Sequence, residues 1–428
     1  MLRNRSSINA SELVVRRHRP AYQIVLYMGL LLLLGLVVMY ALGPQRASVL
    51  NYAYGFEYSD MYFFNKQLVS VIIAVVAFAT CAIVPHKLFT EKNAQYIFLG
   101  GLGACLLLVV CGMIGFSFAE ETNGAYRWFY IGGLGSFQPA ELLKFGALVF
   151  LGGFLGMRAK QGRLNDIQET LVPLALSMGA AMFVVVVLQK DLGTGIALVA
   201  IVLSMLVVSG MKSQLLWKVL GALALAGVLL IVIAPHRMER VMTFLGGDTH
   251  VEVGQEDPNY HITQARIAIG SGGLTGLGIG NSVQASGYLP EAINDSIFAV
   301  MGETFGFVGL VAILGLFTGL LLALLGVVAR LPDIRLRLVV AGVFGWVGSH
   351  VVLNVAAMTG VAPLTGIPLP LLSYGGTSML FIAAALGLAF QLSRFTTHKP
   401  IMEGDGDGKD FGSRRRVGRT RYASGSRI

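Results

Sequence analysis

The chain has 428 residues, of which 55% are hydrophobic and only 13% are charged, and its formal net charge at pH 7 is +9. This composition excludes an ordinary soluble globular protein. Apolar stretches of roughly 20 residues, each long enough to cross a bilayer, recur along almost the whole chain. The sequence therefore predicts an all-α polytopic membrane protein, and its 54 glycines are consistent with closely packed membrane helices.

Ten apolar stretches predict ten transmembrane helices. They cover approximately residues 21–42, 64–84, 94–118, 139–157, 170–188, 192–210, 215–234, 297–328, 338–359 and 374–392. The first stretch is too long for the apolar region of a signal peptide, and no convincing cleavage site follows it. We therefore expect this first helix to be retained.

The basic residues predict the orientation of these spans. If the N-terminus is cytoplasmic, 24 of the 32 Lys and Arg residues fall in cytoplasmic segments, in agreement with the positive-inside rule. Both termini are then cytoplasmic, and the positive charge is explained without a nucleic-acid partner. The predicted domains are an N-terminal tail (1–20), a membrane domain (21–395) and a basic tail (396–428) whose composition is typical of disorder.

Three of the segments that face the outside in this orientation stand out. The longest, residues 235–295, predicts a large extracytoplasmic loop between spans 7 and 8. A second outer loop covers residues 118–138. The prolines of residues 360–373 favour a rigid, non-helical segment that either re-enters the membrane or lies on its surface.

The end of the longest outer segment is the most promising place for chemistry. Seven glycines between Gly270 and Gly287 predict turns and close backbone approaches rather than a helix. Glu291 and Asp295 follow at a spacing of one helical turn, immediately before the apolar run that starts at Ile297. We expect both carboxylates to lie at the membrane surface, where they could act as an acid or a base.

Other ionisable side chains at the ends of spans are few, and each is costly unless it is paired or functional. They are Arg127, Glu141, Lys144, Lys190, Asp191, Glu303 and His350. Glu141 and Lys144, three residues apart, can neutralise one another or belong to a site. Asp191 can cap the helix that follows it or bind a ligand. His350 and Asn354 share a helix face, and we expect hydrogen bonds between helices from them rather than catalysis.

Several common site types are absent from the sequence. The glycine-rich run from Gly270 lacks the Gly-Lys-Ser/Thr ending of a P-loop, and neither HExxH nor GxSxG occurs. Cys81, Cys105 and Cys111 all lie in apolar stretches. This placement indicates small buried residues rather than disulfides or metal ligands.

Four stretches match, in order, the motifs of one membrane family. They are YRWFYIGGLGSFQPAELLK from Tyr126, DLGTG from Asp191, QARIAIGSGGLTGLGIGNSVQASGYLPEAINDSIFAVMGE from Gln264, and NVAAMTGVAPLTGIPLPLLSYGGTS from Asn354. The chain closely resembles the SEDS family (shape, elongation, division and sporulation), the membrane peptidoglycan glycosyltransferases typified by FtsW and RodA. The resemblance covers essentially residues 20–395.

The resemblance implies polymerisation of lipid II into glycan strands on the outer face of the cytoplasmic membrane. Asp295 matches the essential aspartate of the family, which implies a general base that takes a proton from the GlcNAc 4-hydroxyl group and allows inverting attack on the MurNAc anomeric carbon. Undecaprenyl pyrophosphate would leave, stabilised by Arg127, Lys144, Lys190 or a divalent cation such as Mg²⁺ or Mn²⁺, with no organic cofactor. Further candidate substrate-binding residues are Glu141, Asp191, Gln264, Ser271, Gln284, Glu291 and Ser373.

The same resemblance implies partners and a location. These are the nascent glycan strand, a class B penicillin-binding transpeptidase, other division proteins and the bacterial cytoplasmic membrane at the division septum. The Met-Gly-Glu at residues 301–303 and the arginine-rich N-terminal tail favour the division type over the elongation (RodA) type.

The chain departs from the family pattern at several places, including Ala140, where Ser is common, and Thr304, where a second glutamate is frequent. Two other departures bear on the proposed chemistry. Gln189 and Lys190 stand where Glu-Pro is common, which weakens a metal role for that turn. Ile293 and Ser296 replace a usual His and Phe beside Asp295, so we expect no neighbouring imidazole to take part.

Two other functions remain open. Ten spans and a lipid-linked substrate also suit a lipid II flippase, which requires ionisable residues near the midplane and accessible from both faces. The ionisable residues of this chain cluster instead in outer loops and at outer helix ends. A non-catalytic scaffold for a division complex is the third possibility, and it predicts that Asp295→Ala retains function.

Overall fold

We analysed a computed structural model of the chain. It describes residues 20–90, 92–122, 124–130, 132, 135–232, 238, 242 and 260–396. The predicted tails, except Pro20 and Thr396, lie outside the described residues, as does most of the predicted outer loop before residue 260.

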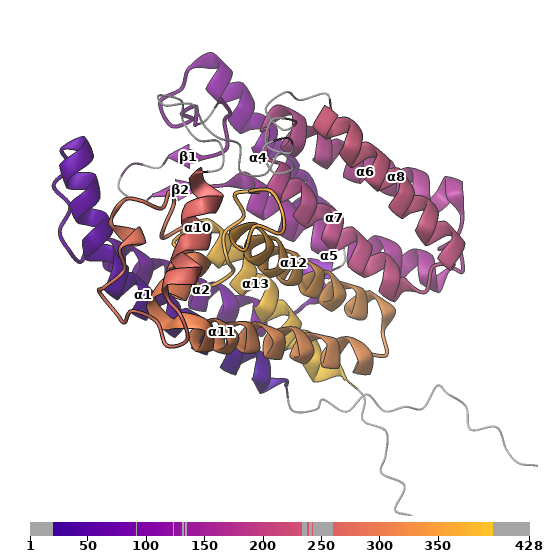
Figure 1. Ribbon diagram of the computed structural model, residues 1–428. Helices are drawn as coiled ribbons and strands as arrows, with labels where there is room; N and C mark the ends of the chain where they lie inside the picture. The colour runs from indigo at the N-terminus through magenta and orange to yellow at the C-terminus, as the bar shows by residue number, and fades with distance from the viewer. Residues whose placement is uncertain are drawn as a thin grey trace, which may run out of the picture. The chain divides into compact units, whose positions relative to one another are not determined.

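The prediction of ten membrane-spanning helices is confirmed (Figure 1). In the described residues these helices are α1 (Tyr22–Tyr54), α2 (Tyr62–Ile83), α4 (Lys92–Ile114), α5 (Pro139–Lys160), α6 (Val172–Met182) with its flanking π-helical turns Ile167–Leu171 and Phe183–Leu188, α7 (Leu192–Ser209), α8 (Ser213–Val232), α11 (Ile297–Arg330), α12 (Ile334–Met358) and α13 (Gly376–Leu392). The shorter elements are α3 (Lys87–Thr90), α10 (Tyr260–Ser271), the 3-10 turns Gln284–Ser286 and Ser393–Phe395, and the strands β1 (Phe129–Tyr130) and β2 (Ser136–Phe137).

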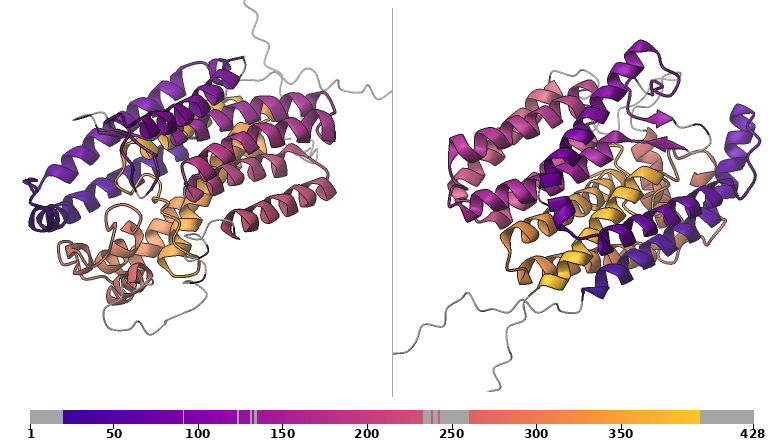
Figure 2. Two further views of the ribbon diagram at one scale, coloured as in Figure 1. Left: turned by 90° about the horizontal axis from the view of Figure 1, so that it is seen from above. Right: turned by 180° about the vertical axis from the view of Figure 1, so that it is seen from behind.

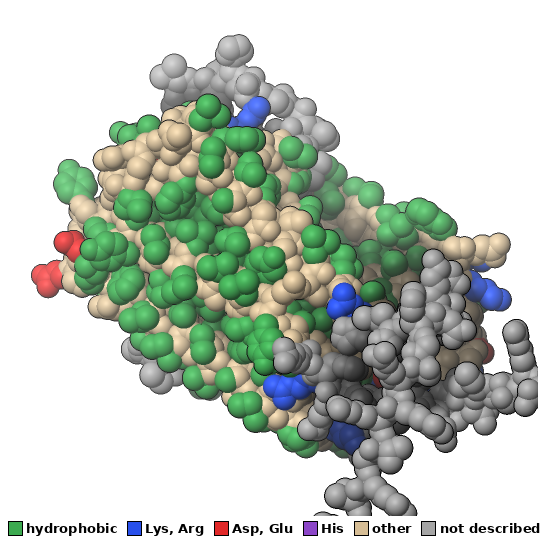
Figure 3. All heavy atoms as spheres, turned by 90° about the horizontal axis from the view of Figure 1, so that it is seen from below, with side chains coloured by type: hydrophobic (Ala, Val, Ile, Leu, Met, Phe, Trp, Pro, Cys, Tyr) green, Lys and Arg blue, Asp and Glu red, His purple; other side chains and the backbone are tan. Residues whose placement is uncertain are grey.

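The most buried helices are α5, α12 and α13, and the others surround them (Figures 1 and 2). Glycines bring helix backbones together, because a Cβ atom at Gly146 of α5 would lie 2.7 Å from the Cα atom of Phe98 in α4. Gly387 of α13 approaches the backbone of Phe78 in α2 in the same way. By contrast, α8 has no buried residue. Apolar side chains dominate the face seen in Figure 3, as expected for a surface in contact with lipid.

Helix α1 is longer than predicted. The apolar stretch ends near Leu42, but the helix continues through Pro44 to Tyr54 and ends at Gly55, whose φ is 70°. The loss of hydrophobicity after Leu42 marks the end of the membrane span but not the end of the helix. The helical turns after Leu42 are stabilised by contacts with another segment of the chain. Gln45 donates a hydrogen bond from Nε2 to the carbonyl oxygen of Gly280, at 2.8 Å. The extension is about 18 Å long and supports the glycine-rich outer loop.

The other outer segments also adopt defined structures. Strands β1 and β2 pair antiparallel within residues 118–138, with Phe129 opposite Phe137. Residues 360–373 are not helical, as predicted, and they enter the bundle: a Cβ atom on Gly35, in the middle of α1, would lie 3.1 Å from the carbonyl oxygen of Leu371. Residues 360–375 are called the re-entrant segment below.

Candidate active site

Asp295 lies where the end of the outer loop, the re-entrant segment and the start of α7 meet. Asn354 of α12 donates hydrogen bonds from Nδ2 to the carbonyl oxygens of Asp295 and Ile367, at 2.7 and 2.8 Å. A Cβ atom on Gly366 would lie 3.5 Å from Oδ2 of Asp295. Gly193, in the first turn of α7, approaches the same part of the re-entrant segment. The carboxyl group therefore faces loops rather than lipid.

The expectation that Glu291 and Asp295 are one helical turn apart is wrong. Residues 290–296 form turns, with φ of 47° at Glu291, and α11 begins only at Ile297. The amide of Asn294 hydrogen-bonds the carboxylate of Glu291, which keeps that carboxylate beside its own turn. As a result Glu291 is exposed whereas Asp295 is partly buried.

The backbone on either side of Asp295 is held by the re-entrant segment and α12. The three successive carbonyl groups of residues 293–295 accept hydrogen bonds from the backbone N–H of Tyr374 (2.9 Å), Oγ of Ser373 (2.7 Å) and Nδ2 of Asn354 (2.7 Å). Ser373 also accepts a hydrogen bond from the N–H of Leu369, at 2.8 Å. Ser373, predicted to bind substrate, thus fixes the Asp295 backbone.

The environment of Asp295 favours its protonated form. Burial makes the largest contribution to raising the pKa of this carboxyl group, and the negative charges of Glu291 and Asp191 act in the same direction. Together they raise the pKa to about 7. A carboxyl group with a pKa near neutrality can take up a proton and release it again near pH 7. This property is the one that a general base needs.

An imidazole lies near this site, where it contacts Ser296 rather than Asp295. His261 of α10 places Nε2 2.6 Å from Oγ of Ser296, and that hydroxyl donates to the carbonyl oxygen of Pro290, at 2.8 Å. Since the hydroxyl proton is used on Pro290, Nε2 of His261 is the donor to Ser296. Sequence reasoning missed this histidine because α10 brings it from 35 residues earlier in the chain.

Asp191 is the N-cap of α7, one of the two roles considered for it. Its Oδ1 accepts from the N–H of Thr194 (2.9 Å), and its Oδ2 accepts from Oγ1 of Thr194 (2.8 Å) and Nε2 of Gln138 (3.1 Å). The cap ties the start of α5 to the start of α7.

Arg127 holds the turn just before this cap. Its Nε and Nη2 atoms donate to the carbonyl oxygens of Gln189 (3.0 Å) and Lys190 (2.9 Å). Lys190 has a φ of 52° and an exposed side chain, and its Nζ would lie 3.6 Å from a Cβ atom on Gly124. Arg127 and Lys190 therefore lie together beside the start of α7, on the side predicted to face outward.

Glu141 and Lys144 form a buried ion pair at the start of α5. Nζ of Lys144 lies 2.9 Å from Oε1 of Glu141, 3.4 Å from Nε2 of His350 and 5.1 Å from the ring centroid of Trp346. Each side chain is at most 4% exposed. The mutual neutralisation considered from the sequence therefore occurs, as a buried charge requires. His350 lies one turn along α12 from Asn354, so this cluster is adjacent to the residues that hold Asp295.

The remaining predicted residues lie in or near the glycine-rich loop. Gln264 is half-buried in α10, and Ser271 at the end of that helix donates from Oγ to the carbonyl oxygen of Ala268, at 3.0 Å. The backbone N–H of Gln284 donates to Oε2 of Glu303, at 3.2 Å. In the described part of the chain, none of these three residues hydrogen-bonds Asp295.

Glu303 organises this loop. Its buried carboxylate accepts from Oγ of Ser282 (2.5 Å) and the N–H of Val283 (3.0 Å) besides that of Gln284. The glycine-rich loop packs against α11 at Gly306, where φ is 67°. Glu303 therefore has a structural function beneath the site.

The described residues contain no group of three or more His, Cys, Asp or Glu side chains placed to hold a metal ion. Asp191 already accepts three hydrogen bonds. The residues that the structure describes therefore do not fit the predicted divalent cation, and the proposed mechanism uses none.

The fold and the site define a multi-pass membrane protein in which the loops at one end of the bundle hold a carboxyl group with a pKa of about 7. The sequence profile of the FtsW, RodA and SpoVE family, described as cell cycle proteins, matches residues 22–398. The chain belongs to this family.

Relatives in this family align over most of their length. The chain is 31% identical over 403 residues to stage V sporulation protein E of Bacillus subtilis, covering 90% of this chain and 100% of that protein. It is 32% identical over 379 residues to the probable peptidoglycan glycosyltransferase FtsW of Nitrosomonas europaea, covering 87% and 93%.

Solved structures share the fold. A chain from the structure of a peptidoglycan synthase complex that coordinates polymerization and crosslinking superposes with a TM-score of 0.65 at 26% identity, covering 87% of this chain and 97% of that one. The rod shape determining protein RodA of Thermus thermophilus superposes with a TM-score of 0.62 at 25% identity, covering 91% and 100%.

Proposed function

We propose that this chain, a peptidoglycan glycosyltransferase by family and relatives, polymerises lipid II into glycan strands with Asp295 as general base. The observation that carries this proposal is the carboxyl group of Asp295. Its pKa is raised to about 7, and three hydrogen bonds hold the backbone of residues 293–295. A base with a pKa near the working pH combines a useful ionised fraction with a useful affinity for the proton.

The proposed step is a single inverting displacement. The GlcNAc 4-hydroxyl oxygen of one lipid II forms a bond to the MurNAc anomeric carbon of the growing strand, while the bond from that carbon to the diphosphate oxygen breaks. The hydroxyl proton passes to the Asp295 carboxylate, and undecaprenyl diphosphate leaves with the bonding electrons. Asn354 and Ser373 position the base through the backbone on either side of it.

The leaving diphosphate develops negative charge, and the cations proposed to stabilise it are Arg127, Lys144 and Lys190. Lys190 is exposed, and Arg127 uses Nε and Nη2 on the turn before α7, which leaves Nη1 for a ligand. Lys144 is paired with Glu141, so its charge is largely neutralised. It therefore acts on the diphosphate as part of an ion pair and more weakly than a free cation would.

The decisive experiment is glycan-strand synthesis from purified lipid II by the reconstituted protein. Asp295→Asn should lower the rate by about 10²- to 10⁴-fold, the range for loss of a general base. Asp60→Asn, which alters an exposed acid in the loop between α1 and α2, is the matched control and should polymerise normally. Normal polymer yield from Asp295→Asn would refute the base assignment.

A flippase predicts a different result from the same preparation. If folded protein moved labelled lipid II between leaflets and made no polymer, transport would replace polymerisation as its function. The position of the buried cluster around Lys144 favours polymerisation, because a flippase requires ionisable residues near the midplane of the membrane. Lys144 instead lies in the first two turns of α5, next to the predicted outer loops.

We further propose a partner and a location. A solved structure similar to this chain comes from a complex that coordinates polymerization and crosslinking. That similarity supports a crosslinking partner, which we propose to be a single-span class B penicillin-binding transpeptidase at the septum. From the distribution of Lys and Arg, we propose that both termini of this chain are cytoplasmic. Co-reconstitution should raise polymer yield severalfold over the chain alone, and full activity of the isolated chain in liposomes would contradict this dependence.

A further inference from the structure

Ser296, the residue directly after the proposed base, joins two segments through its side chain. Its hydroxyl group donates to the carbonyl oxygen of Pro290 at 2.8 Å and accepts from Nε2 of His261 at 2.6 Å. Its backbone N–H donates to the carbonyl oxygen of Glu291, at 3.1 Å. Ser296 is completely buried, so these hydrogen bonds are shielded from water. The hydroxyl group thus closes the turn that carries the base and ties this turn to α10.

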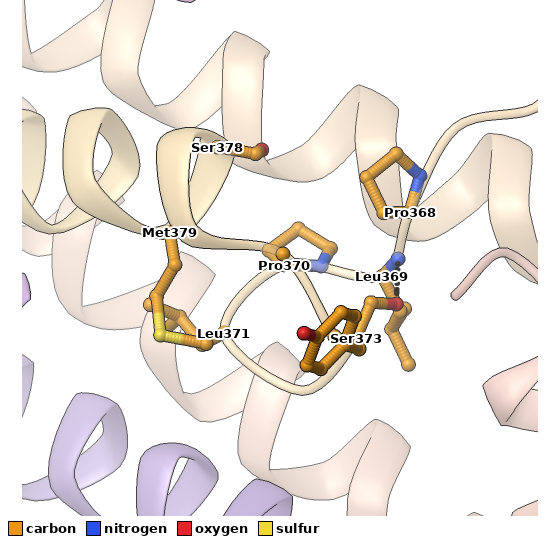
Figure 4. A pocket seen from close by; sticks show the side chains of 9 residues that line it. Pro368, Leu369, Pro370, Leu371, Ser373, Ser378 and Met379 are labelled. Atoms are coloured by element: carbon orange, nitrogen blue, oxygen red, sulfur yellow. Dashed lines mark hydrogen bonds between the residues drawn. The ribbon is translucent and has the colours of Figure 1, made fainter. Parts of the chain in front are cut away.

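The other hydrogen bonds that hold the base come from different elements. They come from α12 and the re-entrant segment and act on the carbonyl groups of residues 293–295. Figure 4 shows the turn of the re-entrant segment that supplies part of them, in which Ser373 accepts from the N–H of Leu369 at 2.8 Å. The contact from His261 acts instead on the residue after the base. The two sets of contacts therefore hold the chain on either side of the Asp295 side chain.

Helix α10 is itself packed against α11 and the re-entrant segment. A Cβ atom on Gly302 of α11 would lie 3.3 Å from the Cα atom of Ile269. A Cβ atom on Gly360, where the re-entrant segment begins, would lie 3.3 Å from Cδ of Arg266. His261 lies in the first turn of this helix. Its imidazole therefore extends from a backbone that is fixed relative to both segments that meet at the base.

The contact between His261 and Ser296 depends on a departure from the family pattern. Ile293 stands where His is usual and is buried, and Ser296 stands where Phe is usual. A Phe side chain has no hydroxyl group and could not accept a hydrogen bond from His261 in this way. The imidazole that the sequence lacks at residue 293 is thus supplied near the base by α10.

We propose that His261 is a positioning residue, which fixes the orientation of the Asp295 carboxyl group by donating a hydrogen bond to Ser296. This assignment rests on the proposed function, because it gives His261 a role in the same proton transfer. His261 exchanges no proton with the substrate and keeps its Nε2 hydrogen on Ser296 throughout. A general base acts only within hydrogen-bond distance of the proton, so a displacement of about 1 Å is costly. Loss of the donor should therefore lower kcat and leave KM almost unchanged, since no contact with substrate is lost.

Two substitutions of His261 isolate its hydrogen bond. His261→Gln keeps an N–H donor on a side chain of similar reach, whereas His261→Leu keeps a side chain of similar bulk without a donor. Both new side chains are uncharged, so a difference between the two variants does not arise from charge. In polymer synthesis by the reconstituted full-length protein, His261→Leu should lower kcat roughly tenfold to a hundredfold, the scale of a misplaced catalytic group. His261→Gln should recover most of this loss, and equal kcat values for the two variants would overturn the proposal.

Tyr260→Phe is the matched control for these variants. It removes a hydroxyl group from an exposed side chain in the same turn of α10 and should keep the wild-type kcat and KM. A loss of kcat in Tyr260→Phe as large as that in His261→Leu would show that any change in this turn disturbs the site, and would overturn a specific role for His261.

A double-mutant cycle tests whether His261 acts through Ser296. Ser296→Ala alone should lower kcat, because it removes the acceptor for His261. Adding Ser296→Ala to His261→Leu should cause a much smaller further loss, because the contact between the two side chains is already broken. Fully additive losses would show that His261 acts by another route and would overturn the proposal.

The pH dependence of stability reports the surroundings of Asp295 without a catalytic assay. If His261→Leu frees the turn, water reaches the carboxyl group and its pKa falls from about 7 toward 3.8. Glu291 and Asp191, which also act on this carboxyl group, are the same in both His261 variants. The pH window in which the melting temperature changes relative to that of the matching Asp295→Asn double variant should move to lower pH for His261→Leu but not for His261→Gln. The same window in both variants would overturn the positioning role, since a merely structural contact would lower the melting temperature at every pH.

These measurements separate the positioning role from the proposed function. If wild-type protein makes polymer, Asp295→Asn does not, and His261→Leu keeps a normal kcat, the function stands and the positioning role fails. If wild-type protein makes no polymer, the proposed function fails. A lower pH window in His261→Leu would then still show that His261 holds Asp295 in place, and an unchanged window would overturn both.

Discussion

Glu291 and Asp295 are separated by only three residues, yet their surroundings give them different chemistry. Glu291 stays in solvent on a turn with positive φ, whereas Asp295 is carried under the re-entrant segment by the hydrogen bonds on its backbone. Because burial disfavours the charged form, the folded protein holds a proton on Asp295 up to about pH 7. The charge on Glu291 contributes to this shift, so the exposed carboxylate raises the pKa of Asp295.

The pH dependence of polymerisation should report the ionisation of Asp295. We expect kcat/KM to rise with pH, with a midpoint near 7, because only the carboxylate can accept the proton. Glu291→Gln removes a negative charge that raises the pKa of Asp295, so its midpoint should move to lower pH. Initial rates measured between pH 5 and 9 would check this, with Asp60→Asn as a control that keeps the wild-type midpoint. An unshifted midpoint in Glu291→Gln would contradict the coupling.

The same ionisation should destabilise the folded protein. The pKa of Asp295 is raised from 3.8 to about 7, so between these values the folded state binds a proton that the unfolded state has lost. The contribution of this residue to stability therefore falls as pH rises through this window and stays low above it. Thermal denaturation should show the melting temperature of the wild type decreasing relative to that of Asp295→Asn from pH 5 to pH 7.5. A constant difference would argue against a raised pKa.

At the scale of elements, the helices were predictable and the contacts among the outer segments were not. A run of about 20 apolar residues fixes a membrane helix by itself, because the bilayer leaves the backbone no other way to satisfy its hydrogen bonds. The glycine-rich run was correctly predicted to form turns, with positive φ at Gly273, Gly276 and Gly278. The residue pattern pointed to Glu291 and Asp295 together, and the family resemblance selected Asp295 as the base. Its environment depends on Asn354, which is 59 residues away, and no local pattern encodes such a contact.

Gly306 joins two of these elements and should tolerate no side chain. Its φ is 67°, and a Cβ atom there would lie 2.3 Å from the backbone nitrogen of Gly276. Gly306→Ala should therefore destabilise the protein by at least about 2 kcal/mol and lower its melting temperature. Gly315→Ala is the matched control on the same helix, because a Cβ atom there meets nothing within 4 Å. It should leave stability unchanged or raise it by up to about 1 kcal/mol. Equal melting temperatures for the two variants would refute the close packing.

At the scale of the whole molecule, polar contacts gather at the two ends of the bundle. One end carries ion pairs between predicted cytoplasmic segments, including Lys160 with Asp333 at 3.0 Å and Arg163 with Glu169 at 2.6 Å. Hydrogen bonds from Lys160 and the N–H of Arg335 lower the pKa of Asp333 against the opposing effect of its partial burial. The other end carries Asp295 and the outer loops. The orientation predicted from the distribution of Lys and Arg places the first of these ends in the cytoplasm.

Cysteine labelling tests that orientation directly. Ser59, between α1 and α2, and Ser213, at the start of α8, are both exposed and are predicted to lie on opposite sides of the membrane. In intact cells a membrane-impermeant maleimide should label Ser59→Cys, and it should label Ser213→Cys only after the membrane is permeabilised. The native Cys81, Cys105 and Cys111 are buried, so the wild-type background should be low. The reverse pattern would place Asp295 in the cytoplasm, where the glycan strand is not assembled, and would rule out the proposed site on topological grounds alone.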